Sequence, residues 1–217
     1  MFRAVKLYES FFWLALVALA LCFFLPKAAW AQNSPKVVPL SAKDVSLLLQ
    51  IASEPVNAAL ENRAPRAPQE PSATSQLNKS YRMVVSVNLD NKLLARAWEL
   101  REPGPLQATA LSLGQRVISE PDIGRPLNPD EYDRAKFSLA IIFNLRIIDD
   151  EKQASAAEAL IVLSGFNYAV GLPRDLRSGS TTFELFSKAC ELSGLSPTAW
   201  LGNRATLYAG QVEEFSR

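Results

Sequence analysis

The chain of 217 residues contains 23 Lys and Arg, 22 Asp and Glu, two Cys and no His. The lack of histidine excludes Ser-His-Asp and Cys-His catalytic pairs and His-ligated zinc or iron, and two cysteines cannot form a four-cysteine metal site within one chain. A net charge of +1 argues against nucleic-acid binding, which requires a basic surface, and we expect no cofactor.

Residues 1–31 have the layout of a secretory signal peptide. A basic start precedes an uninterrupted apolar run at 11–25, and Ala29 and Ala31 provide the small side chains of a cleavage site. We therefore expect cleavage after Ala31 and a periplasmic or secreted protein. The alternatives are an uncleaved anchor, which would be the chain's link to the membrane, and a lipoprotein anchored at Cys22.

Removal of the signal peptide leaves 20 basic and 21 acidic residues and one cysteine, Cys190. The exported protein therefore cannot form an internal disulfide bond and depends on packing for its stability. We interpret residues 32–217 as a single domain.

The first part of this domain combines a helix, a loop and a hairpin. Apolar residues recur at helical spacing over 42–60, whereas residues 63–75 are rich in Pro and Ala and predict a loop. Residues 81–89 alternate between apolar and polar side chains, which is typical of a half-buried strand. The Asp90-Asn91 pair favours a turn, so residues 92–100 are predicted to return as the second strand of a hairpin.

The second part begins with a predicted helix at 106–119 and a short helical turn at 128–131. Residues 136–148 are apolar on both faces, which predicts a strand in the centre of a sheet. Two short strands at 160–163 and 166–172 are predicted to form a hairpin, and a helix is predicted at 183–193.

This order of elements predicts an α+β fold, in which helices pack on a mostly antiparallel sheet.

The C-terminal part of the chain resembles the AMMECR-type domain family. Its run FELFSKACELSGLSPTAWLGNRATLY resembles the family's closing segment, a helix with a Cys, a Gly-Leu stop, a Trp and an aromatic-rich tail. The matching residues here are Cys190, Gly194, Leu195, Trp200, Tyr208 and Phe215.

Three earlier segments resemble the family in the same order. They are DNKLLARAWEL, GRPLNPDEYDRAKFSLAIIFNL and ALIVLSGFNYAVGLPRDL. The resemblance covers roughly residues 41–217. It implies two closely packed subdomains with a cleft between them, MEMO-type and radical-enzyme partners, and an activity that is unsettled.

The family signature is replaced in this chain. The family has a Leu-Arg-Gly-Cys-Ile-Gly run at the end of the hairpin. Aligned on Lys92-Leu93, this chain has Leu94, Ala95, Arg96, Ala97 and Trp98 in place of Arg, Gly, Cys, Ile and Gly. Both flexible glycines and the candidate nucleophilic thiol are lost. The resemblance therefore implies a member without thiol chemistry at this loop.

Arg96 and Trp98 are the main candidate ligand-binding residues, because an Arg beside an aromatic ring can clamp a carboxylate or stack on a planar ligand. The alternative is a cross-strand pair that covers the edge of the sheet. Arg125 and Arg174, in predicted loops together with Arg177, could extend an anion-binding rim or could be solvated charges.

The other chemically active residues have structural interpretations. Cys190 lies on the apolar face of its predicted helix and is expected to be a buried thiol. The consecutive carboxylates of residues 149–151 are expected to splay apart in a turn, so we predict no metal site there. Trp200 and Tyr208 are expected to pack in the core.

Two function classes remain. The first is an exported AMMECR-like domain that is a non-catalytic binding or assembly module in the cell envelope, with an unknown protein or small molecule as its partner. The alternative is an enzyme that acts on a small anionic substrate through carboxylates and arginines in a cleft. The enzyme hypothesis predicts at least one carboxylate whose pKa is raised by burial or by a like charge.

Overall fold

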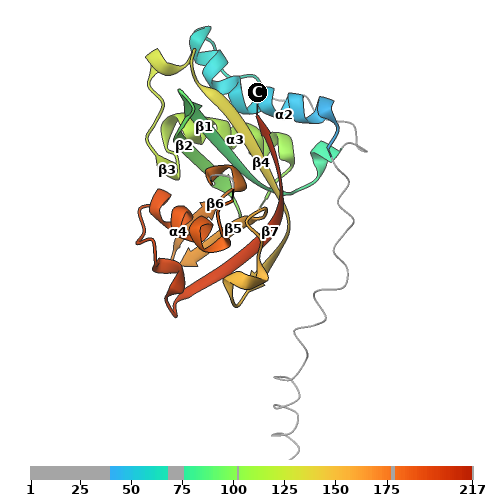
Figure 1. Cartoon of the computed structure of the whole chain (residues 1–217). Helices are drawn as coiled ribbons and strands as arrows, with labels where there is room; N and C mark the ends of the chain where they lie inside the picture. The colour runs from blue at the N-terminus through green and yellow to red at the C-terminus, as the bar shows by residue number, and fades with distance from the viewer. Residues whose placement is uncertain (1–39, 68–75, 102, 177–178, 217) are drawn as a thin grey trace, which may run out of the picture. The chain divides into compact units, whose positions relative to one another are not determined.

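A seven-stranded antiparallel sheet with three α-helices forms the described part of the chain (Figure 1). The computed structural model describes residues 40–67, 76–101, 103–176 and 179–216. The helices are α2 (Ala42–Leu60), α3 (Leu106–Ser119) and α4 (Thr182–Leu192). The strands are β1 (Arg82–Leu89), β2 (Lys92–Glu99), β3 (Ile123–Gly124), β4 (Lys136–Ile148), β5 (Ala159–Ser164), β6 (Asn167–Gly171) and β7 (Ala205–Ser216), and their order in the sheet is β3-β2-β1-β4-β7-β5-β6.

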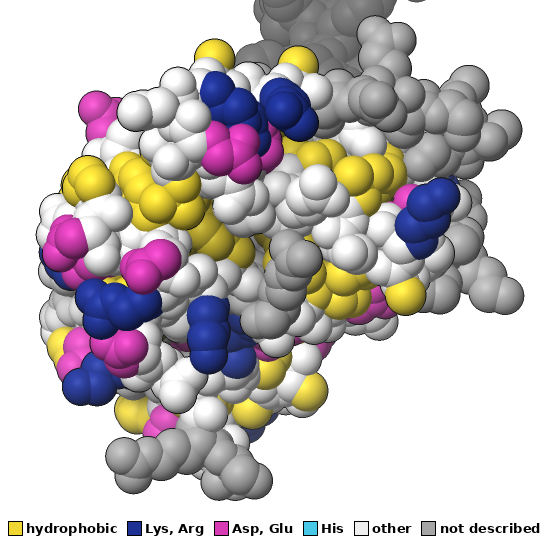
Figure 2. Space-filling model, turned by 90° about the horizontal axis from the view of Figure 1, so that it is seen from above, with side chains coloured by type: hydrophobic (Ala, Val, Ile, Leu, Met, Phe, Trp, Pro, Cys, Tyr) yellow, Lys and Arg dark blue, Asp and Glu magenta, His cyan; other side chains and the backbone are white. Residues whose placement is uncertain are grey.

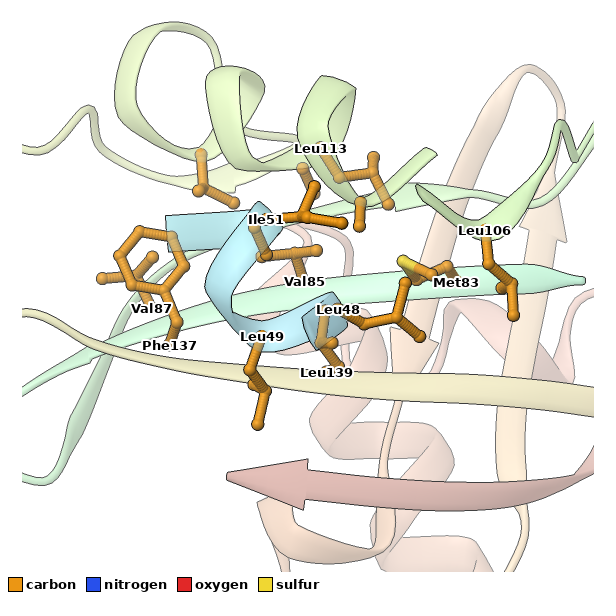
Figure 3. Close-up of a cluster of buried hydrophobic side chains, with 14 of the residues drawn as sticks. Leu48, Leu49, Ile51, Met83, Val85, Val87, Leu106, Leu113, Phe137 and Leu139 are labelled. Carbon is orange, nitrogen blue, oxygen red and sulfur yellow. The ribbon is translucent and has the colours of Figure 1, made fainter. Parts of the chain in front are cut away.

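One half of the sheet packs against α2 and α3. The alternation of β1 directs Met83, Val85 and Val87 to this side, where they meet apolar side chains of both helices (Figure 3). The two helices approach each other closely at Gly114, where a Cβ atom would overlap the carbonyl oxygen of Ala52. Glycine in the middle of α3, unfavourable for a helix in isolation, therefore serves the contact between the helices.

The other half of the sheet packs against α4. The Thr181 hydroxyl caps this helix by accepting a hydrogen bond from the Glu184 backbone NH, and the Glu184 carboxylate accepts one from the Thr181 backbone NH. The buried side chains of α4 include Phe186 and Cys190, which pack on residues of β5, β6 and β7. Trp200 joins this cluster by stacking on Phe186, with ring centroids 5.2 Å apart.

The opposite face of the sheet forms a third apolar cluster inside a curl. Val84 of β1 and Ile142 of β4 pack there with Ile161 of β5 and Val170 of β6. Residues from both halves of the sheet thus share one interior, and the sheet curls into a half-barrel.

The predicted fold class is confirmed, because helices pack on an antiparallel sheet in an α+β arrangement. One large element was not predicted: β7 inserts between β4 and β5 and joins the two halves of the sheet. In the described ranges, no helix combines the length and the apolar character that a membrane crossing requires. The predicted signal peptide at 1–31 lies outside the described residues, as does most of the Pro/Ala-rich loop at 63–75.

Candidate functional site

The two main candidate residues, Arg96 and Trp98, lie on the same face of β2. Residues of a strand alternate between faces, so Ala95 and Ala97 point toward the helices while Arg96 and Trp98 point into the curl. Arg96 pairs with Ser86 of β1 in the sheet register, and Trp98 pairs with Val84.

Arg96 is a buried structural residue, with 1% of its surface exposed. Its Nη1 and Nη2 atoms donate to the two carboxylate oxygens of Asp175 at 2.8 and 2.6 Å. Nε donates to the Ser86 hydroxyl at 2.8 Å, and Nη1 also donates to the Val170 carbonyl at 3.2 Å. We call Arg96, Ser86, Val170 and Asp175 the Arg96 cluster.

The Arg96 cluster fastens the curl of the sheet. Arg96 belongs to β2, near one edge of the sheet, whereas Val170 belongs to β6, at the other edge, and Asp175 follows shortly after β6. The guanidinium therefore connects the two sides of the half-barrel where no backbone ladder joins them. A bidentate pair with a carboxylate is a strong interaction when buried, and it leaves this arginine without an exposed face for a ligand.

The other two candidate arginines are also paired with carboxylates. Arg174 forms an ion pair with Glu214 of β7, and its backbone NH donates to the same carboxylate at 3.2 Å. Arg125 donates from Nη1 to Glu131 at 2.8 Å, and this guanidinium lowers the pKa of Glu131 to about 2. The predicted anion-binding rim thus has no unpaired guanidinium among these residues, and Arg177 lies outside the described residues.

Acidic and basic side chains also lie close to one another on the surface of the molecule. On the face that Figure 2 shows, Lys and Arg side chains lie beside Asp and Glu side chains, with hydrophobic groups scattered between them. This distribution agrees with the small net charge of the chain.

Trp98 lines a groove of about 360 Å³ at the rim of the curl. Four segments meet there: β2, the bend just before β3, the hairpin between β5 and β6, and the residues that follow α4. We call this site the Trp98 groove, and its lining residues are Trp98, Asp122, Phe166, Asn167, Tyr168, Ser193, Gly194 and Leu195.

Phe166 is the most exposed aromatic side chain of the groove. Ser164 pairs with Asn167, so Gly165 and Phe166 form the two-residue turn of the hairpin, with Gly165 at a φ of 63°. The sequence-based prediction placed Phe166 inside a strand, and the structure corrects this. At the turn, Phe166 is 93% exposed, whereas Trp98 on the other side of the groove is only 9% exposed.

Asp122 is the carboxylate of the groove. Its Oδ2 accepts a hydrogen bond from the Trp98 backbone at 2.8 Å, and its Oδ1 accepts one from Arg116 Nη2 at 2.5 Å. Burial raises the pKa of Asp122, and the nearby charge of Glu99 acts in the same direction. The hydrogen bond from Trp98 and the charge of Arg116 oppose this rise in the pKa without reversing it.

Two further polar groups border the groove. The guanidinium of Arg101 lies 5.0 Å from the centre of the Tyr168 ring, and its Nε donates to the Tyr168 hydroxyl at 3.3 Å. The hydroxyl oxygen of Ser193 is buried and has no hydrogen-bond partner in the described part of the chain. A buried hydroxyl without a partner is unusual and gives the groove an unused hydrogen-bonding group.

The remaining candidates have structural surroundings. Cys190 is fully buried, and burial raises the pKa of its thiol, which favours the unreactive form. Residues 149–151 lie at the end of β4, and no group of three or more acidic or Cys side chains within the described ranges could hold a metal ion together. Trp200 is 3% exposed, and Tyr208 packs partly buried against the cluster inside the curl.

The comparisons with known proteins identify a similar fold but no family. No protein-family model matches the chain, and no curated protein matches it. Among solved structures, the crystal structure of an uncharacterized protein from Pyrococcus horikoshii is similar, with a TM-score of 0.67 and 17% sequence identity. The match covers 82% of this chain and 93% of the Pyrococcus chain, and at this identity it establishes a shared fold alone.

Proposed function

We propose that this chain is an exported, divergent AMMECR-type domain that acts as a non-catalytic binding or assembly module in the cell envelope. We further propose that the Trp98 groove is its binding site. The family assignment is supported by the ordered sequence resemblance, whereas the loss of the signature glycines and cysteine supports a divergent member without catalysis at this loop. Export is supported by the signal-like layout of residues 1–31.

The observation that carries the binding proposal is the content of the groove. Trp98, Tyr168 and the 93% exposed Phe166 line one concavity, together with the unpartnered hydroxyl of Ser193. Small-ligand sites are concave and combine aromatic side chains with a few placed polar groups, and here the exposed lining of the concavity is mainly polar. The groove also begins at Trp98, the residue that replaces the last glycine of the family signature.

The non-catalytic part of the proposal follows from the role of Arg96. This residue stands where the family signature has flexible backbone and a thiol, and here it is buried and bonded within the fold. The segment that would carry covalent chemistry in the resemblance thus contributes to the stability of the half-barrel.

Fluorine NMR of the purified protein labelled with 5-fluorotryptophan tests the binding proposal. A fragment library of amines, acids and neutral aromatics should contain compounds that shift the Trp98 signal and leave the Trp200 signal in place. A Trp98→Phe variant assigns the signal. Phe166→Ala should weaken binding about two- to fivefold, the range of one aromatic contact.

Phe183→Ala is the matched control, because Phe183 is an exposed phenylalanine that lies on α4 and packs on Trp200 rather than in the groove. It should leave binding at Trp98 unchanged. If no compound moves the Trp98 signal, or if both variants weaken binding equally, the groove is not the binding site.

Export is tested separately by determining the N-terminus of the protein recovered from the producing cell. Cleavage after Ala31 should leave Gln32 as the first residue, whereas an intact N-terminus would support an uncleaved anchor.

The enzyme hypothesis retains one specific observation, the raised pKa of Asp122, because a partly buried carboxyl group can serve as a general acid. Turnover of small anionic esters that is lost in Asp122→Asn would favour it. The pairing of Arg96, Arg125 and Arg174 with carboxylates takes away the arginines that this hypothesis assigned to substrate binding.

A further inference from the structure

We propose that the Trp98 groove takes a small organic cation, an alkylammonium or alkylguanidinium group. This inference rests on the proposed function, because it names the chemical class of the ligand for the same groove. Four features of the groove support a cation: the aromatic rings, the carboxylate, the end of α4 and the position of Arg101.

The rings of the groove favour a cation. Trp98, Phe166 and Tyr168 line the same concavity from β2 and from the hairpin between β5 and β6. The face of an aromatic ring carries negative potential, and several rings around one space form the usual receptor for a methylated ammonium group. Phe166 is 93% exposed because it lies at the two-residue turn, so its ring is free to contact a ligand.

The carboxylate of the groove can still contact a cation. Asp122 is paired with Arg116, but each of its oxygens accepts only one hydrogen bond and can accept another. Ser193, Gly194 and Leu195 follow the C-terminal end of α4, where the helix dipole favours cations, although their backbone N–H groups already bond to the last carbonyls of the helix. The hydroxyl oxygen of Ser193 lies buried beside the groove without a hydrogen-bond partner in the described part of the chain, so a donor would reach it only after a small rearrangement.

Arg101 shows that a cation is already attracted to this place. Its guanidinium lies over the Tyr168 ring and donates a hydrogen bond from Nε to the Tyr168 hydroxyl. Arg101 is exposed and therefore not fixed by burial. It occupies a ring face that a cationic ligand would also use, so it acts as an internal competitor for the ligand.

Net charge does not select the ligand. Asp122 faces Arg116 of α3 and Glu99 of β2, and Arg101 lies beside the neighbouring ring. These four charges sum to zero, so selection depends on the ring faces, on the end of α4 and on the position of the carboxylate.

The experiment titrates 5-fluorotryptophan-labelled protein with tetramethylammonium and ethylguanidinium chloride, and with sodium acetate at the same ionic strength. The two cations should shift the Trp98 signal in a saturable way and leave the Trp200 signal unchanged, whereas acetate should not. Asp122→Asn should lower the affinity for both cations about two- to fivefold. An unchanged Trp200 signal in that variant shows that the fold is retained.

Arg101→Ala gives opposite results for the two signs of charge. If the groove binds cations, removal of the internal competitor should strengthen binding about two- to fivefold. If it binds anions, the loss of Arg101 should weaken binding instead.

The outcomes separate this inference from the proposed function. If acetate binds saturably and its binding weakens in Arg101→Ala, the proposal of a cationic ligand is wrong, whereas the proposal that the groove is a binding site stands. Binding of neutral fragments without binding of either cation has the same consequence. A Trp98 signal that no compound moves overturns both.

Discussion

Arg96 and Trp98 stand two residues apart on one face of β2, yet the Arg96 cluster and the Trp98 groove differ in whether their polar groups are satisfied. Arg96 lies inside the curl, 1% exposed, with its charge neutralised by Asp175. Trp98 lies at the rim, where the groove leaves an exposed Phe166 and an unpartnered Ser193 hydroxyl. One short segment thus serves stability at one residue and offers a binding surface at the next residue on that face.

The largest expected effect comes from breaking the Arg96 cluster. Asp175→Ala removes the partner of a buried guanidinium and leaves that charge unpaired inside the curl. Removal of one partner of a buried ion pair costs about 3–5 kcal/mol of the free energy of unfolding. Urea denaturation followed by circular dichroism measures this loss.

Arg134→Ala is the control for that variant. Arg134 pairs with Asp90 at 3.4 Å, but their side chains are 51% and 72% exposed. An exposed ion pair contributes about 0–1 kcal/mol, so this variant should unfold at nearly the same urea concentration as the unsubstituted protein. Equal losses in the two variants would show that the Arg96 cluster does not fasten the curl.

Local pattern was sufficient to predict most of the elements. The predicted helices at 42–60 and 106–119 and the predicted strand at 136–148 have the same ends as α2, α3 and β4. In these segments an apolar period of one type continues for the whole length of the element, and capping or turn residues mark the ends.

Strand β7 was missed because its pattern is weak. Its outer part contains Gly210, Gln211, Glu213 and Glu214, which interrupt the apolar alternation although the strand lies between β4 and β5. Glu214 is accommodated because Arg174 pairs with it, and this partner is 40 residues away in sequence. A polar residue in such a strand is explained only by the fold.

The candidate site was predicted only in part, for the same reason. The choice of Trp98 came from its position in the sequence resemblance, and this residue does line the groove. The environment of Arg96 depends on Asp175, 79 residues later, which no local pattern indicates. The exposure of Phe166 could have been predicted from its position next to Gly165, because a side chain at a two-residue turn cannot point into the core.

The Arg125–Glu131 pair extends the comparison to acid stability. Arg125 lowers the pKa of Glu131 to about 2, so the folded chain releases this proton at a lower pH than the unfolded chain does. The resulting stabilisation is present above the usual glutamate pKa and is lost as the pH falls toward 2. Glu131→Gln keeps an acceptor for the Asn128 backbone and removes the charge.

Thermal melting between pH 2 and pH 7 should therefore show Glu131→Gln as less stable at neutral pH, with the difference vanishing near pH 2. If the difference in melting temperature between the two proteins stays constant across this pH range, the pair contributes no charge-dependent stability. Lys188→Ala serves as the control, since its ion pair with Glu191 is exposed and lies on α4.

The smallest effect, and one of opposite sign, is expected for Asp122 in the Trp98 groove. Burial raises the pKa of this carboxyl group, and Glu99 adds to the rise while Arg116 opposes it. The folded chain therefore binds this proton at a higher pH than the unfolded chain, so the group adds stability as the pH falls toward its usual pKa of about 3.9.

Asp122→Asn cannot titrate at this position, so its melting temperature should fall relative to that of the unsubstituted protein as the pH decreases from 7 to 4. The melting temperature of Glu131→Gln should rise relative to that of the unsubstituted protein over the same range. Melting curves of the three proteins over this range measure both trends. Trends of the same sign would mean that Arg116 and the Trp98 backbone stabilise the Asp122 carboxylate as fully as Arg125 stabilises Glu131, which would remove the distinction between the two regions.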